Sequence, residues 1–249
     1  MLEKNDRTQE SYDSLSEMMS IIIESTTSIV DSVFTEYVNH IEHQNQKQIY
    51  NLFADAYLSV SAFCKLMFDH SWSQAATILR MTIEQVSALY ILSEYPTSRD
   101  KFIKLFNEHG QYLRLDDKSK KNYIKDNVIP KNRVNDYFDY SWIKDFTDDN
   151  TYGRDQLLKL AHLDKFLVDI KETLNAFAHG SISIFQFNSN EGKMELMSRF
   201  GFRLVLIVCK LFDFLCCSFK KYIGDNFFYL ELNQQFMNFK KIYLSFIKG

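Results

Sequence analysis

Two charged residues stand alone in one long apolar segment of this chain. Between residues 73 and 93 the only charged side chains are Arg80 and Glu84, which are four positions apart. On an α-helix this spacing puts both side chains on one face, where they can form an ion pair. One interpretation is a structural pair that fixes helix packing, because a buried charge without a partner is costly. The alternative is a polar pocket in which Arg80 presents donors to an anion and Glu84 orients it.

A second polar cluster lies in the segment LNAFAHGSI, residues 174–182. Gly180 fits the left-handed residue that ends a helix, which would place His179 in the last helical turn. One interpretation is a cation stabilised there by the helix dipole. The other is a functional polar face that meets Arg80. Its members lie off the apolar stripe of the helix: Asn175, His179 and Ser181.

A helix with Arg-x-x-x-Glu and a later His-Gly-Ser after an apolar helix resembles uncharacterised bacterial all-helical proteins that are distantly similar to the HEPN superfamily. The resemblance covers about residues 50 to 220. It implies metal-independent RNA cleavage in a bacterial toxin or antiphage defence system, with a site usually completed in a homodimer. HEPN ribonucleases carry an arginine a few residues before the histidine. Here the nearest basic residue before His179 in its predicted helix is Lys171.

This resemblance implies a role for each candidate residue. His179 would be the general acid and base for attack of a ribose 2′-hydroxyl on the adjacent phosphate. Arg80 would stabilise the charged transition state, and Glu84 would complete the catalytic set. Asn175 and Ser181 would position the phosphate, and no metal or cofactor would be needed. The rival hypothesis is a non-catalytic interaction or dimerisation module, in which the same residues only organise the core.

Hydrophobic periodicity predicts an all-α fold, a bundle of long antiparallel helices in a single domain of residues 1–249. The 7 glycines and 2 prolines, with 15% aromatic residues, favour long helices with bulky packing. Helix 72–94 is apolar on most faces, which predicts a central position, and Pro96 stops it. The predicted helices span residues 8–41, 46–69, 72–94, 155–161, 164–178, 226–246 and a long apolar segment from 198.

Residues 97–150 differ from the rest because they are charged, polar and short in period. We interpret them as a polar, loop-rich insertion or lid. Short helices are predicted at 100–113 and 118–125, followed by loop-rich structure before Trp142. Further along, the alternating segment SISIFQF and the turn signal NSNEG predict a small β-hairpin near 182–197.

The charge balance limits the partners. A net charge of −3 gives no general attraction to nucleic acid, so RNA binding must be local. The clusters KSKK (118–121) and FKKY (219–222), with FKKIY near the end, combine lysines with aromatics. Stacking and charge together can bind single-stranded nucleic acid. The ordinary interpretation is a solvated helix face whose aromatics turn inward. The expected partners are RNA and a second copy or a partner protein.

The sequence also predicts a cytoplasmic protein that does not enter a membrane. The N-terminus is polar where a signal peptide would be apolar, and the apolar segment 200–219 contains three charged residues. No Cys-x-x-Cys pair is present, so we expect the cysteines to be reduced core residues. They are Cys64, Cys209, Cys216 and Cys217.

A metal site is the remaining chemical alternative. Glu36, His40 and His43 are spaced so that one helical face could present three ligands. Their surroundings are polar, and a solvated helix end is the ordinary interpretation, so we predict no metal. The sequence contains no nucleophile elbow, phosphate-binding loop, dinucleotide fingerprint or zinc-protease motif, which disfavours chemistry by those routes.

Overall fold

The computed structural model describes residues 2–39, 45–69, 71–164, 202–224 and 230–248. Within these ranges every regular element is a helix and no strand occurs. This confirms the predicted all-α class. The β-hairpin predicted near 182–197 lies outside the described residues.

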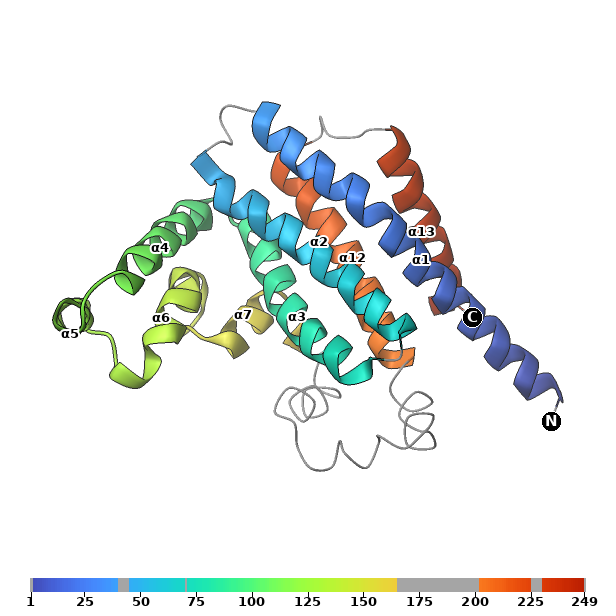
Figure 1. Cartoon of the computed structure of the whole chain (residues 1–249), viewed down its shortest axis with the longest axis horizontal. Helices are drawn as coiled ribbons and strands as arrows, with labels where there is room; N and C mark the ends of the chain where they lie inside the picture. Colours follow the sequence, from blue (N-terminus) through green and yellow to red (C-terminus); the bar gives the residue numbers. More distant parts are fainter. Residues whose placement is uncertain (1, 40–44, 70, 165–201, 225–229, 249) are drawn as a thin grey trace.

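Long helices form the body of the molecule (Figure 1). Short connections make α1, α2 and α3 antiparallel neighbours, and α12 packs against α2 and α3. The helices predicted within the described residues agree with these elements to within a few residues, except at the N-terminus of α1. Beyond its first residue, the helix predicted at 164–178 lies outside the described residues. The bounds are α1 (Leu2–Asn39), α2 (Lys47–Phe68), α3 (Trp72–Glu94), α12 (Phe202–Ile223) and α13 (Leu230–Lys248).

Aromatic side chains join α2 to α12 in the centre of the core. Phe53 of α2 is fully buried, and its ring centroid lies 4.9 Å from that of Phe219 on α12. One turn further along α2, the Tyr57 centroid lies 6.2 Å from that of Phe212. Phe212 in turn makes an edge contact with Phe239 of α13, at 5.0 Å. Because these residues recur at helical spacing, one face of each helix is apolar and turns inward.

Helix α3 is central, as predicted. It packs against α2, α12 and the short helix α7 (Arg154–Leu160). Buried hydroxyl groups are compatible with these apolar surroundings because they donate hydrogen bonds to backbone carbonyls of α3 itself. Thr82 donates to the Ile78 carbonyl at 2.9 Å, and Ser87 donates to the Ile83 carbonyl at 2.7 Å. The covering is incomplete on one side, where the Met81 side chain is 58% exposed.

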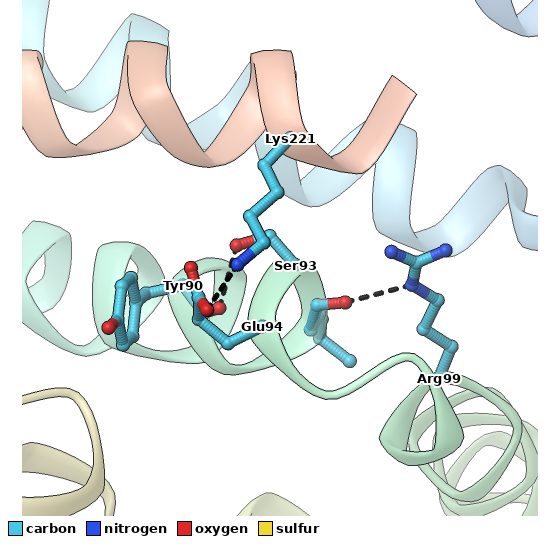
Figure 2. A network of polar contacts seen from close by, with 6 residues as sticks. Tyr90, Ser93, Glu94, Arg99 and Lys221 are labelled. Carbon is cyan, nitrogen blue, oxygen red and sulfur yellow. Dashed lines mark hydrogen bonds and ion pairs between the residues drawn. The ribbon is translucent and has the colours of Figure 1, made fainter. Parts of the chain in front are cut away.

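A polar network fixes the corner between α3 and α4 (Thr97–Leu113) (Figure 2). Lys221, at the end of α12, pairs with Glu94 at the end of α3. Arg99 of α4 donates from Nε to the Leu92 carbonyl at 2.8 Å and lies over the Tyr222 ring, 4.4 Å from its centroid. Burial lowers the pKa of Arg99. Since the C-terminal ends of α3 and α12 meet here, the two helices run in the same direction.

Residues 97–160 pack against one side of the bundle (Figure 1). The helices predicted at 100–113 and 118–125 are present, but the loop-rich structure predicted before Trp142 is wrong, because that stretch forms short helices. These helices are too short for their buried residues to recur with a helical period. The buried residues are Phe138, Trp142 and Ile143. The elements after α4 are α5 (Asp117–Asp126), η2 (Lys131–Arg133), α6 (Val134–Tyr140) and η3 (Ser141–Phe146).

Several surface predictions can be compared with the burial of individual residues. Phe219 and Tyr222 are buried while Lys220 is exposed, which confirms the inward-facing aromatics of FKKY. Cys64 and Cys209 are buried, and all four cysteines are free. Cys217 is exposed, so its assignment to the core was wrong: it lies on the outer face of α12. None of the described helices combines the length and apolar character that crossing a bilayer requires.

Candidate functional site

Glu84 of α3 is the centre of a polar network that joins the bundle to the packed-on helices. Its Oε1 atom lies 2.7 Å from Nε of Arg154, the first residue of α7. Its Oε2 atom accepts a hydrogen bond of 2.9 Å from the Tyr140 hydroxyl at the end of α6. The Glu84 and Arg154 side chains are 29% and 22% exposed, so the pair is largely withdrawn from water. The cation that compensates Glu84 therefore comes from Arg154, although the sequence indicated Arg80.

Tyr140 is held as a neutral donor in this network. Burial raises its pKa above the ordinary range, and the negative charge of Glu84 raises it further. The hydroxyl therefore stays protonated at neutral pH and donates a hydrogen bond to the carboxylate. With Arg154 on the other oxygen, Glu84 has a specific partner for each carboxylate atom.

The remaining predicted site residues are divided between described and undescribed parts of the chain. Arg80 is half-buried on α3, one turn before Glu84. His179, Asn175 and Ser181 lie outside the described residues. The described chain stops just after α7 and resumes at α12, and both helices pack on α3. Figure 1 shows the two ends of this interval beside the bundle.

The metal alternative has no counterpart in the described part of the chain. His40 and His43 lie outside it. Among the residues that are described, no group of three His, Cys, Asp or Glu side chains is arranged to hold a metal ion.

A pocket of about 380 Å³ opens beside Glu84, between α3 and the packed-on helices. Its walls are mostly aromatic and aliphatic, and several polar groups converge on it. The apolar lining consists of Leu52, Met81, Ala88, Phe102, Phe106, Phe138, Trp142 and Leu157. The polar lining consists of Glu84, Gln85, His109, Asp139 and Tyr140.

Acceptors dominate the polar lining of this pocket. Burial raises the pKa of Asp139, the nearby charge of Glu84 adds to this, and His109 opposes it. The Oε1 atom of Gln85 is buried and has no hydrogen-bond partner among the described residues. His109 stacks on Phe138 with centroids 4.5 Å apart and ring planes 8° from parallel. The pocket therefore offers flat apolar faces and oxygen acceptors, an arrangement that disfavours an anion.

Replacing Asp139 with asparagine is expected to stabilise the protein at pH 7 by about 0.5 kcal/mol or less, because the residue is exposed and its carboxylate is only partly withdrawn from water. The folded pKa of Asp139 lies above its unfolded value, so the folded state binds more protons between the two values. Stability from this group is therefore lost as pH rises through the folded pKa, and the gain in Asp139→Asn should shrink at low pH. Urea denaturation at neutral and acidic pH measures both effects.

The matched control is Asp145→Asn on η3. Asp145 is 61% exposed and pairs with Lys101, which lowers its pKa. Its replacement should bring no gain at pH 7. A loss of stability in Asp139→Asn would contradict the assigned cost of partly desolvating this carboxylate.

Sequence reasoning missed this pocket because its lining comes from several separate elements. Asp139 and Tyr140 fall in the stretch interpreted as loop-rich, and His109 lies on a separate helix, α4. The available signal was the density of aromatic residues between Phe102 and Trp142. That signal indicates a packed unit but not a pocket.

The chain matches no family model, no curated protein and no solved structure. Evidence on its function therefore comes from its own residues and their placement.

Proposed function

We propose that this protein is a metal-independent ribonuclease of HEPN-like type, with His179 as general acid and base and Arg80 as the cation that stabilises the transition state. The observation that carries this proposal is the position of Arg80. It is a half-buried arginine on the central helix α3, which packs against α7 and α12, the described helices that precede and follow residue 179 in the sequence.

The geometry around Arg80 is compatible with this chemistry. Helix α7 is fixed to α3 by Arg154 and Glu84, and the chain continues from α7 towards His179. After residue 179 in the sequence, the next described helix is α12, which runs parallel to α3. The N-terminal ends of α3 and α12 therefore lie at the same end of the bundle. Glu84 has the role of a positioning residue here, because its carboxylate is engaged by Arg154 and Tyr140. Asn175 and Ser181 keep their proposed role as phosphate ligands.

The biological setting of the proposal follows from the resemblance to HEPN proteins. RNA is the substrate, a second copy of the chain completes the site, and the protein acts in the bacterial cytoplasm as a toxin or antiphage effector. The acceptor-lined pocket beside Glu84 is a separate feature, because Arg80 is not among the residues that line it.

The decisive experiment compares RNA cleavage by purified wild type, His179→Ala and Arg80→Ala in the presence of EDTA. We expect the histidine variant to lose about 100-fold or more in rate, the typical contribution of general acid–base catalysis. Arg80→Ala should lose about 100-fold through the unstabilised transition state, with partial recovery in Arg80→Lys. Arg114→Ala, which removes an exposed arginine at the end of α4, should cleave normally.

Two results would overturn the proposal. One is full activity in a folded His179→Ala protein, with folding checked by circular dichroism. The other is a wild-type protein that neither cleaves total RNA nor arrests growth when its expression is induced.

The second candidate function is a non-catalytic interaction module that dimerises. It is favoured by large apolar side chains exposed on neighbouring helices: Leu58 on α2 is 51% exposed and Met81 on α3 is 58% exposed. A protein that is inactive on RNA, yet dimeric by light scattering until Leu58→Glu is introduced, would favour this module over the ribonuclease.

A further inference from the structure

The pocket beside Glu84 has the dimensions of a small-molecule site. Its volume of about 380 Å³ lies in the range of ligand pockets, which run from roughly 300 to 1,000 Å³. It is formed by residues of α2, α3, α4, α6, η3 and α7, so its walls belong to packed helices. A site built in this way is largely preformed.

The walls favour a planar ligand. The Trp142 ring meets Phe102 edge to face at 5.4 Å, and Phe138 is stacked against His109. Phe106 also lines the pocket and is 55% exposed. Exposing a phenyl ring to water is unfavourable, and a bound molecule would cover it. Aromatic faces of this kind attract flat rings, and they attract cations most strongly.

The polar groups specify the charge of the ligand. Arg154 compensates Glu84, whereas Asp139 forms no ion pair with another described residue. His109 is the one basic side chain that lines the pocket among the described residues. A ligand that pairs with the Asp139 carboxylate must supply N–H donors, and a positive charge on the ligand would offset the charge of Asp139.

We propose that this pocket binds a small planar cation of the aromatic amidine class, with its ring against the aromatic walls and its N–H groups donating to the Asp139 carboxylate. The proposal does not depend on the ribonuclease function, because Asp139, the residue proposed to pair with the ligand, has no proposed role in RNA cleavage. Phosphates and carboxylates are disfavoured because the pocket is lined by the carboxylates Glu84 and Asp139.

The test uses benzamidine as the probe and isothermal titration of the purified full chain. Two ligands of the same shape serve as controls, the neutral benzamide and the anionic benzoate. We expect sub-millimolar binding of benzamidine, which is reasonable for a ligand of this size. Benzamide should bind about 10-fold more weakly, and benzoate should not bind measurably.

Variants of the protein locate the binding. Asp139→Asn should weaken benzamidine about 10-fold or more, because it removes the charged acceptor and is expected to fold at least as well as wild type. Asp145→Asn removes an exposed carboxylate outside the pocket and should leave affinity unchanged.

Any of three results would overturn the proposal: no binding at millimolar benzamidine, equal binding of benzamide, or an affinity that Asp139→Asn does not change. RNA cleavage is measured on the same preparations. The pocket proposal and the ribonuclease proposal are thereby tested separately, because either proposal can fail while the other holds.

Discussion

Replacing Phe53 with alanine is expected to lower the free energy of unfolding by about 3 to 5 kcal/mol, the usual cost of removing a large aromatic side chain from a core. Phe53 is fully buried where α2 meets α12, with ring centroids 4.9 Å from Phe219 and 5.4 Å from Tyr222. These rings come from distant parts of the chain and cannot close the cavity without moving α12. Urea denaturation followed by circular dichroism measures the loss.

Leu58→Ala on the same helix provides the control. Its side chain is 51% exposed, so truncation creates no closed cavity and should cost about 0.5 kcal/mol or less. Equal losses in the two variants would mean that the α2–α12 contact does not form the core. That result would also remove the scaffold on which α3 and Arg80 are placed.

The long helices could be predicted from sequence because their apolar spacing persists over many turns. The α2 face that carries Phe53 and Tyr57 is an example, and so is the end of α3 before Pro96. The short helices α6 and η3 could not be predicted, since each offers only one or two turns of pattern. Their positions are determined by tertiary packing of Phe138 and Trp142, which local spacing does not reveal.

The candidate site shows the same division between local and long-range information. The sequence correctly singled out Glu84 as an unusual charge on an apolar helix, because that signal is local. Its ion-pair partner could not be identified, since Arg154 is separated from it by the whole of the packed-on helical segment. Rules for neighbours on one helix can propose only Arg80. The pocket was missed for a similar reason, because Asp139 and Gln85 converge only after folding.

Removing Arg154 is expected to be the most damaging single change to the polar network. Arg154→Ala leaves Glu84, which is only 29% exposed, without its cation, and should cost about 2 to 3 kcal/mol. The estimate is below the cost for fully buried pairs because both side chains retain some contact with water. The double variant Arg154→Ala with Glu84→Gln should recover part of this loss, since no uncompensated carboxylate remains. Urea denaturation of the single and double variants gives the coupling energy directly.

The matched comparison is the pair of Lys104 and Glu108 on α4. Their charged atoms are 3.9 Å apart and the Lys104 side chain is 78% exposed, so the same cycle should yield a coupling of about 0.5 kcal/mol or less. For Arg154 and Glu84 a coupling of about 1 to 2 kcal/mol is expected. A value no larger than that of the α4 pair would show that the Glu84 network does not hold α7 against α3. Helix α7, the last described helix before His179 in the sequence, would then not be fixed to α3. The proposed contact of His179 with Arg80 would lose this structural support.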